Sequence, residues 1–416
     1  MRTQDQVSAG GQQGIALLIM IIVIALTAIT FFISSMSTRD IVFENQLRTI
    51  ESLKKAKRAL LAYAANYPEQ NPTVRGPGYL PCPDSDNDGR SETGCNPAGV
   101  VSTGRFPWAT VGTGDLRDGD SERLWYAVSE MFDYTSSPSV NKINSQTTGN
   151  LTLRDKNNNI LFDGTGGNAA VAVIIAPGAS LVRDDGIVQN RSPGTGDPND
   201  PTNYLDTVLA IGEDNASFQH GTLDGFVRGV VVNGSNQVIV NDVIEVITYD
   251  EIMEVIHRRV AGELTNALIA YTNVGVPPCI NLPDAAIFDP TRAAGLYISD
   301  AGVRQGHIPV DSPDWAGGGC ADGLLPDWVE AEEWHKVSYY HFAASVPCAI
   351  GVDCLSVNNS NPAVNNADAL IVFAGRDLNG VRHINNISEY YENENADFDL
   401  VYDAAELEDS IWVISP

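Results

Sequence analysis

The chain has 416 residues, a length that fits two average domains, or two domains and an anchor. Its apolar fraction of 43% is ordinary for a folded protein and excludes global disorder. The net charge of −28 argues against nucleic acid as a partner, because a duplex is bound through Lys and Arg that displace its counterions. We interpret the acidity as a solvated surface in a salty exterior, with an acidic binding face as the alternative.

An uncharged apolar run lies near the N-terminus. Ile15 to Ile33 contains no charged residue, no Pro and no Gly, and these nineteen residues would rise about 28 Å as a helix. That length crosses a hydrocarbon core, so the sequence predicts a transmembrane helix over residues 15–36. A cleaved secretory signal is the alternative, but its apolar core would be shorter, and Ser34-Ser35-Met36 is a weak cleavage site.

Helix-forming residues follow the apolar run without interruption. Between Thr38 and Tyr67 there is neither Pro nor Gly, and apolar residues return at three- and four-residue steps (Ile50, Leu53, Ala56, Leu60 and Tyr63). The pattern predicts one unbroken helix from Ile15, ended by Pro68, whose second part over 38–67 packs on a globular domain.

A short polar leader ending in Gly14, directly before an apolar helix that starts at Ile15, resembles the type IV pilins and type II secretion pseudopilins. The resemblance implies a leader over residues 1–14, cleaved after Gly14 by a prepilin peptidase, and methylation of the new N-terminus at Ile15. Two positions depart from the family pattern. The first mature residue is usually Phe or Met, and the fifth is usually Glu, whereas Ile19 stands here. In the family, that Glu pairs with the N-terminal amine of a neighbouring subunit in the filament. A subunit that begins a filament has no earlier neighbour whose amine must be neutralised in lipid, so loss of the Glu suits such a subunit.

Six cysteines follow the apolar run, which suggests three disulfides in an oxidising compartment. Spacing alone leaves fifteen pairings open. An internal repeat reduces them: it pairs Cys82 with Cys95 and Cys279 with Cys320, and leaves Cys348 with Cys354.

The repeat consists of short echoes that occur in the same order in both halves of the chain. The clearest are Ala59–Tyr63 with Ala267–Tyr271, Leu80-Pro81-Cys82 with Pro277-Pro278-Cys279, Arg123–Tyr126 with Lys336–Tyr339, Ala169–Pro177 with Ala367–Gly375, Asn215–Phe218 with Asn395–Phe398, and Asp242–Ile247 with Asp409–Ile414. Continuous apolar runs such as 170–175 and 369–373 predict central strands covered by a helix. We therefore expect an α+β fold with two duplicated pilin-like domains, residues 37–249 and 250–416, each a helix on an antiparallel sheet.

An acidic loop is the main candidate for a metal site. Asp84, Asp86 and Asp88 stand at positions 1, 3 and 5 of a calcium-type loop with Gly89 at position 6, and Glu92 falls at position 9. Position 12, where a bidentate Glu is expected, is Cys95, so the loop is not a complete EF-hand. The alternative is that Asp and Asn gather here because turns favour them. A second acidic group, Asp115, Asp118 and Asp120, is a weaker candidate.

Catalytic patterns are poor, and we expect no enzyme. His335 and His341 flank a predicted strand near Glu332 and Glu333, but no HExxH or Cys-His pattern occurs, and surface histidines are the simpler interpretation. No phosphate-binding Gly loop is present.

The resemblance implies a minor or tip subunit of a type IV pilus or a type II secretion-like apparatus, acting in filament assembly or in contact at the tip. It implies a Gram-negative inner membrane anchor, with the bulk of the chain periplasmic or at a filament tip on the cell surface. The partners it implies are other pilins or pseudopilins, met through the N-terminal helix. Calcium, the one candidate cofactor, rests on the acidic loop and not on the resemblance. A membrane-anchored adhesin or ligand-binding protein is the second interpretation, and an exported hydrolase the third.

Overall fold

The computed structural model describes residues 11–70, 75–95, 102–133, 142–219, 225–272, 281–287, 297–298, 300–311, 325–349, 352–360, 363–376, 391, 395, 399–404 and 409–414. Within the first helix, it describes the side chains of residues 15–31 and of residue 40 onward. In each half of the chain a long helix is accompanied by a run of mostly antiparallel strands, so the predicted α+β class is confirmed.

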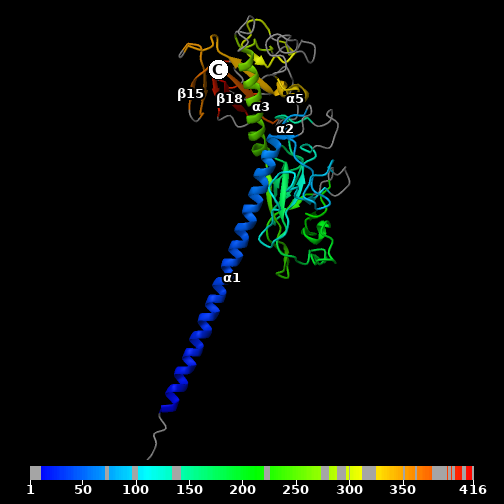
Figure 1. The fold of residues 1–416 in the computed structure, drawn as a ribbon, viewed down its shortest axis with the longest axis vertical. Helices are drawn as coiled ribbons and strands as arrows, with labels where there is room; N and C mark the ends of the chain where they lie inside the picture. The colour runs from blue at the N-terminus through cyan, green and yellow to red at the C-terminus, as the bar shows by residue number, and fades with distance from the viewer. Residues whose placement is uncertain are drawn as a thin grey trace, which may run out of the picture.

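A single long helix, α1 (Gly11–Ala65), is 55 residues long and projects well beyond the rest of the protein (Figure 1). It ends at Ala65, two residues earlier than predicted, and Pro68 lies in a short helix, α2 (Tyr67–Gln70). The first turn of a helix tolerates Pro because its N–H groups have no partner within the helix.

The N-terminal part of α1 exposes its apolar side chains. Ile15 is 63% exposed and Phe31 is 77% exposed. Among the residues that the structure describes, no helix is both long and apolar enough to cross a membrane. The transmembrane helix predicted over residues 15–36 is therefore not supported by the structure.

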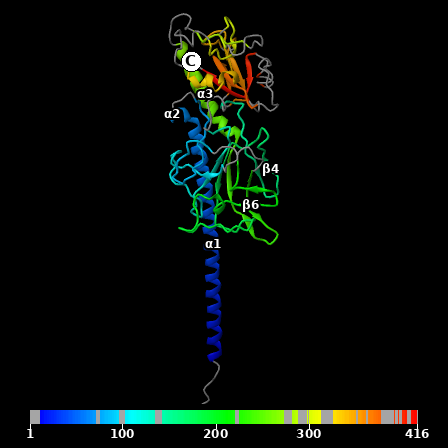
Figure 2. The ribbon, with the colours of Figure 1, turned by 90° about the vertical axis from the view of Figure 1, so that its right-hand side faces the viewer.

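The first domain is an antiparallel sheet that lies against the C-terminal half of α1 (Figure 2). Its strand order is β1-β2-β5-β11. The strands are β1 (Gly104–Arg105), β2 (Trp125–Val128), β5 (Ala172–Ala176) and β11 (Val243–Ile247). Leu53, Ala56 and Leu60 of α1 are at most 2% exposed, and every residue of the central strand β5 is buried. Residues 172–175 of the predicted apolar run thus lie in a strand with both faces covered.

The second domain repeats this arrangement around helix α3 (Tyr249–Thr272). Its antiparallel sheet has the order β12-β13-β16-β18. The strands are β12 (Gln305–His307), β13 (Ser338–Phe342), β16 (Ala369–Phe373) and β18 (Ser410–Ile414). Two short helices, α5 (Asp327–Ala331) and α6 (Trp334–Val337), lie between β12 and β13 in the chain. All residues of β16 are buried, as in β5.

Strand registers relate the two sheets residue by residue. One row of paired residues in the first sheet contains Gly104, Tyr126, Ile174 and Glu245, and the matching row in the second contains Gly306, Tyr340, Ile371 and Trp412. An isolated bridge flanks each edge strand in the same way, Asp84 with Arg105 and Ala286 with His307.

These registers correct three of the sequence echoes. Tyr126 corresponds to Tyr340 and Ile174 to Ile371, each one residue away from the alignment made on the sequence. A one-residue slip matters because it turns every side chain of a strand to the opposite face. Counting back from the Asp84 and Ala286 bridges, Leu80-Pro81-Cys82 corresponds to Leu282-Pro283-Asp284 and not to Pro277-Pro278-Cys279. The echo of Asp242–Ile247 in Asp409–Ile414 agrees with the registers.

A smaller sheet accompanies each main sheet, again with matching topology. The strand orders are β4-β3-β8 and β15-β14-β17, each with one antiparallel and one parallel pair. Their strands are β3 (Leu153–Arg154), β4 (Ile160–Phe162), β8 (Phe226–Val227), β14 (Leu355–Asn358), β15 (Val364–Ala367) and β17 (Val401–Asp403). In the first domain, Leu153 and Phe226 pack with Trp125 in one apolar cluster, so this sheet covers the face turned away from α1. The remaining short elements are η1 (Pro201–Asn203), β6 (Thr207–Val208), β7 (Glu213–Asp214), β9 (Val231–Val232) and β10 (Val238–Val240).

A buried Asn joins the two layers in both domains. The side chain of Asn215 accepts from the N–H of Val227, donates to its carbonyl, and donates to Asp242. The side chain of Asn395 makes the same three bonds, to the N–H and carbonyl of Asp403 and to Asp409. The repeated Asn-Ala-x-Phe and Asp echoes therefore correspond to a repeated structural contact.

The two domains share one apolar core and a buried polar contact. Glu332, between α5 and α6, is 2% exposed and accepts from the Tyr79 hydroxyl at 2.9 Å and the Ile143 N–H at 2.7 Å. Arg75 bonds the Tyr79 hydroxyl, and Asn144 donates to the Glu332 carbonyl. These contacts fix the domains against each other.

Candidate functional site

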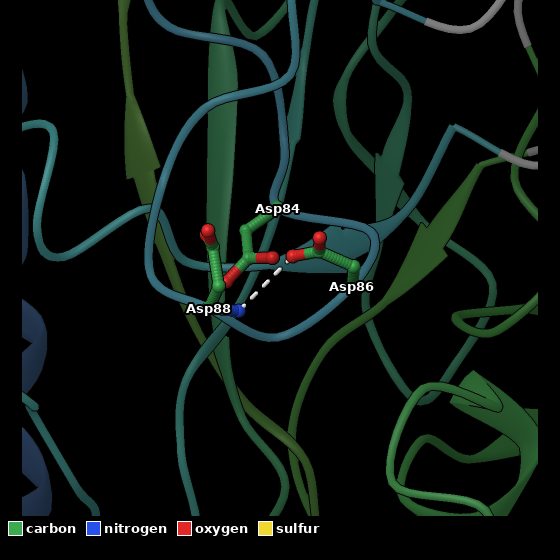
Figure 3. A group of neighbouring side chains, drawn as sticks. All are labelled: Asp84, Asp86 and Asp88. Carbon is green, nitrogen blue, oxygen red and sulfur yellow. Dashed lines mark hydrogen bonds between the residues drawn. The ribbon is translucent and has the colours of Figure 1, made fainter.

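The acidic loop brings three carboxylates together (Figure 3). One oxygen each from Asp84, Asp86 and Asp88 lies within 4.8 Å of the others. Oxygens that share a Ca²⁺ at about 2.4 Å are at most about 4.8 Å apart, so the spacing fits a common ion. The chemistry also fits, because Ca²⁺ prefers carboxylate and carbonyl oxygens.

Asp84 organises the loop from inside. It is 1% exposed and accepts from the N–H groups of Asn87 at 2.6 Å and Gly89 at 2.7 Å. Burial raises the pKa of the Asp84 carboxyl, these two bonds lower it, and the charges of Asp88 and Asp86 raise it further. A cation at the loop would favour the ionised form of all three carboxylates.

Gly89 is required at its position for two reasons. Its φ of +88° lies in the left-handed region, and a Cβ there would stand 2.3 Å from the Trp108 ring. Asn87 also has a positive φ, 67°, and Arg123 donates to both its backbone and side-chain oxygens. The loop is thus fixed by Trp108 and Arg123 of the same domain.

Glu92 does not join the three aspartates. Its Oε1 accepts from the N–H of Ser85 at 3.0 Å and from the Ser85 hydroxyl at 2.6 Å. Its role in the described structure is to close the loop from outside.

Two of the three predicted disulfides are present. Cys82 bonds Cys95, closing the acidic loop, and Cys348 bonds Cys354. Cys279 and Cys320 lie outside the described residues. Asp284 stands where the first domain has Cys82, and Ala286 where it has Asp84, so the second domain does not repeat the acidic loop.

The second acidic group is a structural turn. Asp118 is 1% exposed and accepts from the N–H groups of Asp120, Glu122 and Gly178. Asp115 pairs with Arg117 and Arg123. Among the described residues, the ligand atoms of Asp115, Asp118 and Asp120 do not converge as those of Asp84, Asp86 and Asp88 do, so the weaker metal candidate is not supported.

The prediction that His335 and His341 are surface histidines is wrong, and the two other described histidines are buried as well. His257, His307, His335 and His341 are each 4% exposed or less. His341 lies within β13 and not beside it, and its Nδ1 is 2.6 Å from the Tyr402 hydroxyl. His335 lies in α6, 3.5 Å from the Val329 carbonyl. Their environment is a packed interior without a convergent set of metal ligands among the described residues.

The expected processing position lies inside α1, which begins at Gly11, before both Gly14 and Ile15. Sequence reasoning missed two features of the first domain that only the fold assembles. Arg105 is buried with its guanidinium 4.0 Å from the ring centres of both Trp125 and Tyr204, and burial lowers its pKa to about 10. A cleft also lies between α1 and β11. The Arg105 contact joins residues 99 positions apart and the cleft joins residues 201 positions apart, so no local motif indicates either feature.

Comparison with known proteins returned no matching family model, no matching curated protein and no matching solved structure.

Proposed function

We propose that this chain is a minor or tip pilin-like subunit of a type IV pilus or type II secretion-like apparatus. The supporting observation is the division of α1: its C-terminal half lies on an antiparallel four-stranded sheet, while its N-terminal part projects with exposed apolar side chains. A helix divided in this way suits a subunit whose head stays in water while its helix packs with other apolar helices in lipid.

In this proposal, residues 15–36 anchor the chain in an inner membrane, and the two domains are periplasmic or stand at a filament tip. The partners are other pilins or pseudopilins, met through α1, and a prepilin peptidase. The uncharged sequence from Ile15 to Ile33 supports the anchor. The role is assembly or contact at the filament end and not catalysis. Ile19, in place of a Glu, and the doubled head support a place at the tip.

Processing is tested by Gly14→Ala. This variant should keep its leader, because the peptidase would no longer find Gly before the cleaved bond, and it should still insert, because the apolar run is unchanged. Mass spectrometry of the membrane fraction measures both. Gly11→Ala is the control, with the same substitution within the leader, and should be processed normally. Normal removal of residues 1–14 from Gly14→Ala would contradict the pilin assignment.

Calcium at the acidic loop is the second part of the proposal. Three carboxylates in a loop held closed by Cys82–Cys95 repel one another, and a cation between them would relieve that repulsion. Calcium at 100 times its dissociation constant should stabilise the folded chain by about 2.7 kcal/mol. Thermal melting of the full chain in detergent, with calcium and with chelator, measures the effect.

Asp86→Asn should abolish the calcium response, since it removes one ligand charge at an exposed position. Asp197→Asn is a suitable control. Like Asp86, Asp197 accepts a hydrogen bond from the backbone N–H of the residue two positions later, but it lies outside the three-carboxylate group. Identical melting curves of the unmodified chain in calcium and in chelator would show that the loop is an ordinary solvated turn.

A further inference from the structure

A cavity of about 370 Å³ lies beside β12, the edge strand of the main sheet in the second domain. Small-molecule sites in proteins have volumes of about 300–1,000 Å³, so the cavity has room for a small ligand. We call it the edge pocket. Its polar lining residues are Arg304, Gln305, His341 and Asp399, and its apolar ones include Val303 and Leu400.

Three of these side chains carry polar atoms that have no partner in the part of the chain that the structure describes. His341 is only 4% exposed, and while its Nδ1 lies 2.6 Å from the Tyr402 hydroxyl, its Nε2 has no hydrogen bond. Oε1 of Gln305 is buried and has none either. The exposed guanidinium of Arg304 makes no ion pair with a described residue. Buried polar atoms are normally hydrogen-bonded, so unpaired ones in residues that line a cavity indicate a bound molecule.

The strand register holds the three groups together. Gln305 and His341 stand directly opposite each other in β12 and β13, so their side chains leave the sheet on the same face. Arg304 lies close enough to act on the ring electrostatically. Burial and, to a lesser extent, the charge of Arg304 lower the pKa of His341 to about 4. The ring is therefore neutral at pH 7, and a Tyr402 hydroxyl that donates to Nδ1 leaves the single ring hydrogen on Nε2.

The first domain builds the same two sheets without these groups. The strand registers show which of its residues stand at the equivalent places. The counterparts of Arg304, Gln305, His341 and Tyr402 are, in that order, Ser102, Thr103, Ala127 and Phe226. The fold therefore does not require a cation, an amide, an imidazole and a phenol at these four places, and their presence together in one domain indicates a site.

The charges around the edge pocket define the class of ligand. A guanidinium donates to carboxylates in strong, charge-assisted hydrogen bonds, and the amide of Gln305 and Nε2 of His341 add neutral donors. Asp399 contributes a carboxylate to the same lining. A simple anion would be repelled by Asp399, whereas a ligand that carries both a carboxylate and an ammonium group complements both signs of charge. Free amino acids are small molecules of this kind.

We propose that the edge pocket binds a free amino acid. Arg304, Gln305 and His341 hold its carboxylate, and its ammonium group faces Asp399. Tyr402 is a positioning residue, because its hydroxyl fixes the ring of His341 and sets which nitrogen of the ring carries the hydrogen. The inference goes beyond the proposed function and does not rest on it, since it requires neither a membrane anchor nor a filament.

Thermal melting of the full chain in detergent tests for the ligand, with each common amino acid added in turn at millimolar concentration. At least one of them should raise the Tm, because a ligand that binds only the folded state stabilises it. Acetate and ethylammonium are the controls, since each carries only one of the two charges, and neither should raise it. A Tm unchanged by every amino acid, or raised equally by acetate, would overturn the proposal.

Isothermal titration calorimetry with the amino acid that gives the largest shift locates the site. Arg304→Gln should raise the Kd about tenfold or more, because it removes the charged hydrogen bonds to the carboxylate. Arg228→Gln is the matched control, at an exposed arginine of the first domain outside the edge pocket, and should leave the Kd unchanged. Both positions are exposed, so both variants should fold. An unchanged Kd in Arg304→Gln would overturn the proposal.

Tyr402→Phe and His341→Ala test the positioning role, and each introduces the residue that the first domain has at the equivalent place. Both should weaken binding several-fold. Adding Tyr402→Phe to His341→Ala should cause no further loss, because the hydroxyl acts on the ligand only through the imidazole, whereas a separate structural role would add its own effect. Additive losses in the double variant would overturn the role of Tyr402, and full binding by His341→Ala would overturn the site.

Discussion

Acidification to pH 4.5 is expected to unfold the second domain before the first. Burial lowers the pKa of His257 and His307 to about 3, and that of His335 and His341 to about 4. In the unfolded chain a histidine pKa is about 6.5, so the unfolded state binds more protons below that pH. Stability is therefore fully present above pH 6.5 and falls as the pH falls toward 4. Each histidine contributes a loss of roughly 2 kcal/mol at pH 4.5, and the sum approaches the whole stability of a domain.

The first domain should respond in the opposite direction. Burial raises the pKa of Asp206 to about 6, and burial beside Asp206 raises that of Asp242. The folded state then binds more protons than the unfolded state between about pH 6 and 4, so falling pH stabilises this domain. The ionised forms of Asp206 and Asp242 are favoured by hydrogen bonds from Gln189 and Asn215 and by the charge of Arg191. These interactions are weaker than the effect of burial, so both pKa values remain raised.

Hydrogen exchange followed by mass spectrometry at pH 7 and pH 4.5, corrected for intrinsic rates, measures the two responses separately. Protection should be lost in β13 and β16 and retained in β2 and β5. His341→Asn, which keeps a polar group near the Tyr402 hydroxyl but does not titrate, should move the loss to lower pH. Equal loss in both sheets, or retained protection in β13 and β16 at pH 4.5, would contradict this account.

Glu332→Ala is expected to have the second large effect. The substitution leaves the Tyr79 hydroxyl and the Ile143 N–H without their carboxylate acceptor, and it removes the negative charge that faces Arg75. Breaking a buried charged contact of this kind costs about 3–5 kcal/mol. Because these groups come from both domains, the loss should also loosen the domains against each other.

Glu330→Ala is the matched control, two residues away in α5 and exposed, and should change stability by no more than about 0.5 kcal/mol. Urea unfolding monitored by tryptophan fluorescence gives the difference in free energy. Glu332→Gln keeps one acceptor oxygen, so its free energy of unfolding should lie between those of Glu332→Ala and Glu330→Ala. A midpoint for Glu332→Ala equal to that of Glu330→Ala would show that the contact between the domains does not depend on this carboxylate.

The sequence predicted those features that short segments determine. A stretch free of Pro and Gly predicts the helix through Ala65, and continuous apolar runs predict the central strands β5 and β16. Asp84, Asp86 and Asp88 stand within five positions of one another, so their convergence followed from the local pattern, although the contacts of Trp108 and Arg123 that fix the loop did not. The repeat paired Cys82 with Cys95 correctly, although it matched Cys82 to the wrong position in the second half.

Features that depend on register and on distant residues were not predictable. Tyr339 looked like the partner of Tyr126 because both follow similar residues, but pairing with β16 assigns that place to Tyr340. The burial of His257 was not predictable, because no local pattern shows that a domain boundary will cover it with Ser145, 112 residues away. The cleft between α1 and β11 has no motif at all, because its lining comes from segments that lie far apart in the sequence.

The mass of the intact protein, isolated from its native membrane, tests the central claim that this chain is a prepilin-type subunit. The account predicts loss of residues 1–14 and addition of one methyl group at Ile15, with the rest of the chain retained and its six cysteines oxidised. A protein that begins at Met1 without a methyl group, or one that begins near residue 37, would contradict it.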